Sequence, residues 1–264
     1  EQTAWAKRYF RDQVQPVVSP IALDPSHPFP RLVNKSLNFI LSLEGKDAFN
    51  RESGLAVVPA PRSLPRIIRV PDHLTDGGDN FVFLSSIIHA NVNDLFSGMK
   101  VKECHKFRVT RNADLQMNSG EVEDIALALK GELSSRRFGT AVKLEVSHDC
   151  PDNICEFLLE HFNLTNSEMF RLDGPLNLHR LLKIDSMMNR PDLLYPALVP
   201  GLPKSLHDQN LFDSIRREDR LLLHPFQSFT PVIDLLRSAA KDPTVLAIKM
   251  TLYRTGESSE LVDA

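Results

Sequence analysis

The chain has 264 residues, of which 42% are hydrophobic and 25% are charged, and its formal net charge at pH 7 is −3. This size allows about two domains with a sizeable core, and the composition is that of a globular protein. The slightly acidic balance argues against a general nucleic-acid binder, so a polyanionic partner would need a local basic patch.

The first hundred residues predict a helix, a connector, three strands and a second helix. Apolar spacing indicates a helix over Gln2–Gln13, and four prolines between residues 14 and 29 indicate an extended connector. Alternating apolar residues predict strands at Leu37–Leu43, Gly54–Pro59 and Arg66–Val70. Helical spacing resumes over Asn80–Leu95.

The segment Lys100–Asp114 predicts a strand with two different faces. Strict alternation groups Val101, Phe107 and Val109 on one face. The other face would carry four cations around Cys104, namely Lys100, Lys102, Lys106 and Arg108. Such a face could contact a polyanion, or it could be a solvated edge that lysines protect against mispairing. The pattern leaves both interpretations open.

The next part alternates helices and strands before a proline-rich linker. The predicted elements are a helix at Gly120–Phe138, a strand at Gly139–Val146, and helices at Asn153–Asn163 and Leu176–Met187. Four prolines between residues 190 and 204 predict a long linker. We place a domain boundary near Asn210, which divides the chain into residues 1–210 and 211–264.

The last part predicts a βαβ unit with parallel strands. Strands are expected at Leu221–Leu223 and Val245–Tyr253, with a helix between them that begins at Thr230. Lys249 lies in the second strand, and Arg254 lies at its carboxyl end, where open parallel sheets bind ligands. An arginine next to the start of another helix suits an anion site. Pairing of Arg254 with a nearby carboxylate is the structural alternative.

Three long segments resemble bacterial polyphosphate kinases. HPFQSFTPVIDLLRSAAKDPTVLAIKMTLYRTG, residues 224–256, resembles the start of the first phospholipase-D-like catalytic domain of that family. FRVTRNADL at 107–115 and QPVVSPIALDPSHPFPRLVNKSLNF at 15–39 resemble its middle, or head, domain. The resemblance implies an α+β head domain followed by the opening βαβ unit of an α/β phospholipase-D-like domain.

The resemblance also implies an activity, substrates and site residues. The family reversibly transfers the γ-phosphate of ATP to inorganic polyphosphate through a phosphohistidine, with Mg2+ as cofactor. ATP, ADP and polyphosphate would be the partners, together with a second copy bound through the head domain. By resemblance, Arg254 would help to hold magnesium and phosphate. From within the predicted sheet, Lys249 would add positive charge. Arg111, which lies just outside the predicted strand pattern, is a phosphate-contact candidate.

Several motifs are absent from the sequence. There is no G-x-x-x-x-G-K-[ST] loop and no G-x-G-x-x-G. None of the nine histidines opens the H-x-K-x-x-x-x-D pattern in which a histidine attacks phosphorus. We therefore expect no catalytic residue in this chain and a phosphohistidine beyond Ala264. Because the chain begins at Glu1 and Ala264 falls inside a predicted helix, we also expect both ends to be cut from a longer protein.

Cysteine usage and hydropathy indicate the compartment. Cys104, Cys150 and Cys155 are an odd number with irregular spacing, which predicts neither a disulfide framework nor a zinc site and favours a reducing cytoplasm. No apolar run approaches the ~20 residues that span a bilayer, although membrane association stays open.

Two other functions remain as alternatives. A phospholipase-D-like phosphodiesterase or nuclease would share the predicted parallel sheet. The 264 residues by themselves could instead be a non-catalytic module for oligomerisation and polyanion binding.

Overall fold

The computed structural model describes residues 1–23, 29–45, 54–112, 139–203, 206, 210–251 and 260–263. The chain divides into two compact units, Glu1–Asn189 and Arg190–Ala264, and each is described by itself. None of the helices among these residues is long and apolar enough to cross a membrane.

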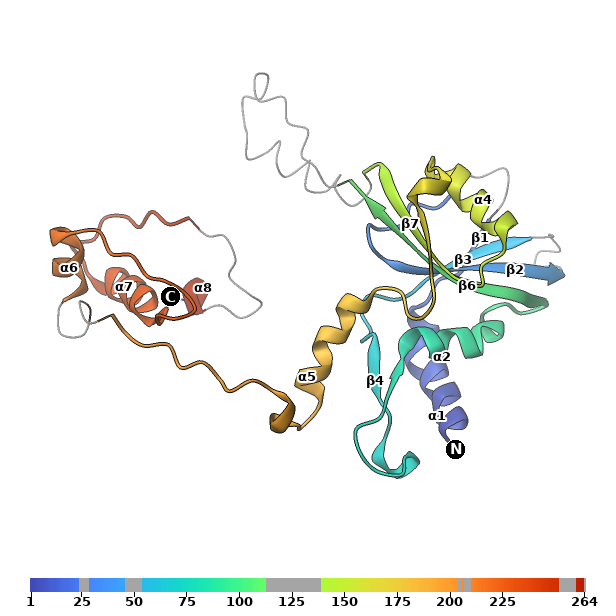
Figure 1. Cartoon of the computed structure of the whole chain (residues 1–264), viewed down its shortest axis with the longest axis horizontal. Coiled ribbons are helices and arrows are strands. Elements are labelled where there is room, and N and C mark those ends of the chain that lie inside the picture. Colours follow the sequence, from blue (N-terminus) through green and yellow to red (C-terminus); the bar gives the residue numbers. More distant parts are fainter. Residues whose placement is uncertain are drawn as a thin grey trace, which may run out of the picture. The chain divides into compact units, whose positions relative to one another are not determined.

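A six-stranded sheet forms the centre of the first unit, in the order β1-β3-β2-β6-β7-β8 (Figure 1). Its strands are β1 (Ile21–Leu23), β2 (Leu37–Gly45), β3 (Leu55–Pro59), β6 (Met99–Arg111), β7 (Ala141–Ser147) and β8 (Met169–Leu172). Neighbouring strands are antiparallel except β7 and β8, which are parallel. The fold is therefore mixed α/β with a mostly antiparallel sheet, and the strands predicted at β2, β3, β6 and β7 are confirmed.

Helices cover both faces of this sheet (Figure 1). On one face lie α2 (Leu84–Asn91) and α1 (Gln2–Tyr9), which continues as a π-helical turn, Phe10–Val14. On the other face lies α4 (Asp152–Phe162), which packs on β6 and β7. Because both faces are covered, the first five residues of β2 are all buried, and its apolar residues are nearly continuous.

A β-bulge in β6 changes which side chains share a face. Ser42 of β2 is opposite Glu103, whereas Leu43 is opposite Val101, so β6 carries one extra residue at Lys102. Val101 consequently packs with Cys104 against the α1 and α2 side, while Phe107 packs on the α4 side. The expectation of four cations on one continuous face was wrong, because alternation does not hold across a bulge.

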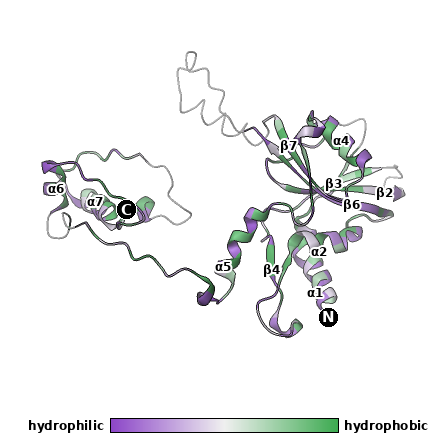
Figure 2. Ribbon diagram, viewed as in Figure 1, coloured by the Kyte–Doolittle hydropathy of each residue, from purple (hydrophilic) through white to green (hydrophobic). Residues whose placement is uncertain are grey.

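A second, two-stranded sheet lies beside α2. It pairs β4 (Ile67–Arg69) with β5 (Phe81–Phe83). In Figure 2 hydrophobic residues, coloured green, run along β4 and β7. The helix predicted from residue 80 begins only at α2, because its first residues pair as β5 instead.

Short helical turns complete the first unit. The segment predicted as a helix at 176–187 is a 3-10 helix, Leu178–Lys183, that continues as α5 (Ile184–Met187). The described residues of this unit also form 3-10 turns at Gln15–Val17, Asp72–Leu74, Val92–Leu95 and Asn166–Glu168, and the second unit has one at Pro191–Leu193. The predicted helix at 120–138 lies outside the described residues.

The second unit contains α6 (Leu211–Arg217), α7 (Thr230–Lys241) and α8 (Glu260–Asp263). The helix of the predicted βαβ unit is confirmed as α7, but its two strands are not. Residues 221–223 and 245–251 form no strand, and 252–253 lie outside the described part. A strand needs a neighbour to pair with, and the described residues of this unit record only one β-bridge, between Gly201 and Gln227. Leu246 is consequently 98% exposed.

Candidate functional site

Of the two site residues predicted in the second unit, the structure describes only Lys249. Lys249 is exposed and lies in irregular chain after α7. Arg254 lies outside the described residues. Their grouping with a phosphate site therefore stays a prediction from sequence.

Arg111 lies at the end of β6, in the first unit, where its side chain binds backbone. Its Nε donates to the carbonyl oxygen of Leu32 at 3.2 Å, and its Nη1 donates to that of Gly139 at 3.0 Å. The guanidinium carbon lies 5.7 Å from the centre of the Phe162 ring. Burial lowers the pKa of Arg111. Arg111 also lines a hollow of about 310 Å³, so its remaining N–H groups could still meet a ligand.

A larger cavity in the first unit is strongly cationic, and we call it the arginine pocket. Its volume is about 490 Å³. The lining residues are Asn34, Lys35, Ser36, Arg62, Arg66, Arg108, Asn177, His179 and Arg180. They come from the turn before β2, the chain between β3 and β4, β6, and the 3-10 helix that follows β8.

The cations of the arginine pocket are poorly neutralised. Arg108 lies 3.4 Å from the carboxylate of Glu145. In the part of the chain that the structure describes, Lys35, Arg62 and Arg180 make no ion pair within 4 Å. The positive charge of the pocket is therefore largely open to an external anion.

Arg66 lies at the centre of this charge. Burial, followed by the positive charges of Arg180 and Arg62, lowers the pKa of Arg66 to about 10. One of its terminal nitrogens donates to the carbonyl oxygen of Ala60 at 3.3 Å. The other, Nη1, is buried without a hydrogen-bond partner among the described residues, as is Nε of Arg108.

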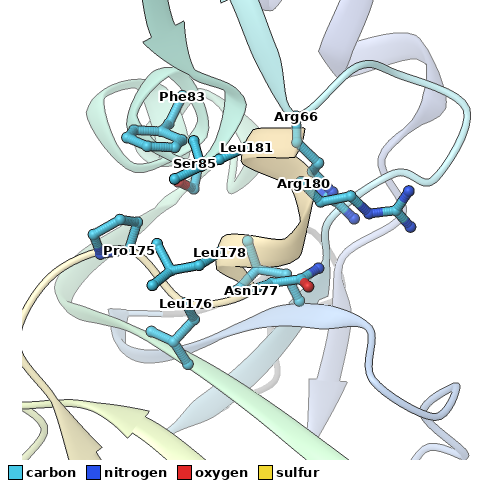
Figure 3. Close-up of a pocket in the computed structure, with 10 residues that line it drawn as sticks. Arg66, Phe83, Ser85, Pro175, Leu176, Asn177, Leu178, Arg180 and Leu181 are labelled. Atoms are coloured by element: carbon cyan, nitrogen blue, oxygen red, sulfur yellow. The ribbon is translucent and has the colours of Figure 1, made fainter. Parts of the chain in front are cut away.

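A small apolar hollow adjoins the arginine pocket (Figure 3). The two cavities share Arg66, Asn177 and Arg180. Figure 3 shows the guanidinium groups of Arg66 and Arg180 extending to the same side, away from Phe83 and Pro175. The hollow holds only about 20 Å³, which is space for about one water molecule.

Sequence reasoning missed the arginine pocket. It singled out Arg108 within a basic strand, but the other cations are spread between residues 35 and 180 and match no motif. Only the pairing of the strands brings these segments together, so their spacing carried no signal.

Magnesium is the cofactor that the resemblance implies. The described ranges contain no group of three or more His, Cys, Asp or Glu side chains that could hold a metal ion. Arg254, which the resemblance associates with magnesium, has a guanidinium, and this group offers donors and no lone pair to a metal. These residues do not fit a magnesium site.

Two family models match the chain, one in each unit. Polyphosphate kinase middle domain matches residues 1–184, and polyphosphate kinase C-terminal domain 1 matches residues 210–264. The chain belongs to the polyphosphate kinase family. The polyphosphate kinase of Pseudomonas syringae pv. tomato is 59% identical over 262 residues, covering 99% of this chain and 36% of the relative. That of Neisseria gonorrhoeae is 51% identical over 264 residues, covering 100% of this chain and 38% of the relative.

A solved structure supports the fold. The crystal structure of polyphosphate kinase from Porphyromonas gingivalis matches with a TM-score of 0.68 at 24% identity, covering 99% of this chain and 37% of that chain. The chain thus spans little more than a third of the length of the polyphosphate kinases that it matches.

Proposed function

We propose that the chain is the central part of an enzyme that reversibly transfers the γ-phosphate of ATP to inorganic polyphosphate. The observation that carries this proposal is the match of two polyphosphate kinase family models, in order, over 1–184 and 210–264. We assign residues 1–210 to the middle domain and residues 211–264 to the start of a phospholipase-D-like domain.

In this proposal the second unit supplies charge and the attacking group lies elsewhere. Arg254 would neutralise charge that develops on the transferring phosphoryl group, and Lys249 would add to the positive field. Arg111 is a secondary phosphate-contact candidate. The phosphohistidine would lie outside this chain, so the 264 residues alone are expected to have no turnover. Location in the cytoplasm and self-association through the middle domain are further parts of the proposal.

Turnover by the full-length protein tests the proposal. It should form ADP and inorganic phosphate chains from ATP, and the reverse reaction should form ATP. Hydrolysis of phosphodiesters without phosphate transfer would instead support the phosphodiesterase alternative.

The role of Arg254 is tested separately by Arg254→Ala in the full-length protein. Loss of one group that stabilises transition-state charge typically lowers kcat about 100-fold or more. Arg216→Ala is the matched control, because Arg216 is an exposed arginine of the same unit. Unchanged kcat in Arg254→Ala would remove this residue from the site while leaving the family assignment in place.

A further inference from the structure

We propose that the arginine pocket is a binding site for a linear oligophosphate, separate from the residues assigned to phosphoryl transfer. That the anion is a phosphate chain rests on the proposed function. That the site takes an anion rests on the pocket alone.

The charge of the cavity points to an anion. The chain as a whole carries −3, yet five permanently charged cations line one cavity of about 490 Å³. Of these five cations only Arg108 makes an ion pair within 4 Å among the described residues, and its partner, Glu145, also pairs with Lys143. Like charges gathered in a partly buried space repel one another, and an anion bound among them removes this cost. Burial is the main cause of the lowered pKa of Arg66, and the positive charges of Arg180 and Arg62 lower it further.

The donors of the cavity suit several phosphate groups rather than one. Guanidinium forks bind phosphate oxygens in pairs, and Arg62, Arg66 and Arg180 provide three of them. Nη1 of Arg66 is a buried donor without a partner among the described residues, so Arg66 adds positive charge to the cavity while its hydrogen-bonding capacity is incompletely used. The cavity volume falls within the range of about 300–1,000 Å³ typical of small-ligand sites.

Backbone conformation at the rim supports a binding role. Lys35 and Asn177 have positive φ angles, 58° and 67°, and they are two of three such non-glycine residues in the described chain. Residues hold this conformation at an energetic cost and concentrate at binding sites. Both residues line the arginine pocket, and Lys35 thereby presents its charge there.

The neighbouring apolar hollow disfavours a nucleotide. A nucleoside triphosphate would need space for its base beside the phosphates, but the adjoining hollow of about 20 Å³ fits one water molecule. A base-free phosphate chain needs no such space, so we expect the adenosine of ATP to add no affinity at this site.

Calorimetry on the 264-residue chain tests the site with tripolyphosphate, orthophosphate and ATP as probes. Tripolyphosphate should bind at least tenfold more tightly than orthophosphate, and about as tightly as ATP. ATP binding more than tenfold tighter than tripolyphosphate would show a nucleotide site and overturn the proposal, as would equal affinity for tripolyphosphate and orthophosphate.

The decisive variant is Arg62→Gln with Arg180→Gln, since both side chains are exposed and make no ion pair in the described chain. Its affinity for tripolyphosphate should fall at least tenfold. The matched control is Arg8→Gln with Arg11→Gln, which removes the same charge from exposed positions outside the pocket. The proposal would be overturned if the affinity of the pocket variant for tripolyphosphate fell less than threefold, or if the affinity of the control fell equally.

Thermal unfolding separates binding from a structural role. Without ligand, the pocket variant should be at least as stable as the wild type, because two charges that repel Arg66 are gone. Tripolyphosphate should raise the Tm of the wild type and not that of the variant. An equal rise in the Tm of the wild type and of the variant would contradict the proposed binding site.

Lys35→Asn is a second variant, in case the first fails to fold. It removes a charge with a residue that tolerates positive φ. It should weaken tripolyphosphate binding at least threefold, and unchanged affinity would overturn the proposal. Because these measurements use binding and not turnover, the site and the proposed kinase activity can each fail alone.

Discussion

Replacement of Arg111 distinguishes a structural role from a phosphate-binding one. Its guanidinium joins three segments, because it donates to the carbonyl oxygens of Leu32 and Gly139 and its own residue ends β6. The backbone N–H of Arg111 donates to the side chain of Asn34 at 2.8 Å, and that bond survives substitution. Arg111→Ala should therefore destabilise the first unit through the side chain alone.

The size of the loss follows from the contacts. A hydrogen bond from a charged donor contributes about 1.5–3 kcal/mol, and a cation–π contact at a partly exposed site contributes about 0.5–1 kcal/mol. Because Arg111 is only half-buried, solvent screens these interactions and lowers their contribution to stability. We expect Arg111→Ala to lower the free energy of unfolding by about 3 kcal/mol. Arg111→Lys should restore less than half of it, because an ammonium cannot reach two carbonyls as a planar fork does.

Urea unfolding followed by tryptophan fluorescence measures this loss. Trp5 is the single tryptophan and packs against the core of the first unit, so the signal reports on that unit. Arg8→Ala, at an exposed position of α1, should change stability by less than about 0.5 kcal/mol. A loss below about 1 kcal/mol for Arg111→Ala, together with weaker phosphate binding, would refute the structural role.

Two further predictions concern the strand ends and the buried thiols. A Cβ at Gly139 would overlap the carbonyl oxygen of Asn112, so Gly139→Ala should cost about 1–3 kcal/mol and lower the Tm, whereas Gly54→Ala, with open space around it, should not. Burial raises the pKa of the Cys104 thiol from 9.0 to about 12, so its thiolate fraction at pH 8 is about a thousandfold below that of the unfolded chain. Alkylation of Cys104 should slow accordingly and accelerate as the pH rises; equal rates in the native and urea-unfolded chain would disprove this.

The elements with many alternating or helically spaced residues could be predicted from the sequence. Strands β2, β6 and β7 and helices α4 and α7 bury a long apolar pattern, and their positions follow from it. Strands β1 and β8 have only three and four residues, so pairing with β3 and β7 decides their structure rather than local pattern.

Longer-range geometry could not be predicted in the same way. The bulge at Lys102 depends on how β6 pairs with β2, and no local residue signals it. Residues 245–251 have a strand-like pattern but pair with no strand among the described residues, so the pattern alone was insufficient.

The candidate site residues also divide into those that a local sequence motif predicts and those that only the fold brings together. Arg254 and Lys249 were predicted because they lie in one continuous motif, and their role stays a prediction. The arginine pocket gathers side chains from four separate segments, which only the folded sheet brings together.

The two outermost strands of the central sheet bear on how copies of this protein can meet. Both β1 and β8 are very short, so each leaves few free backbone groups along its outer side. A sheet whose edge strands are short offers few backbone hydrogen-bonding groups to a strand of another chain. This protects the protein against edge-to-edge aggregation. Any lasting association of two middle domains should therefore rely on side-chain complementarity between helices or loops rather than on a sheet that continues across subunits.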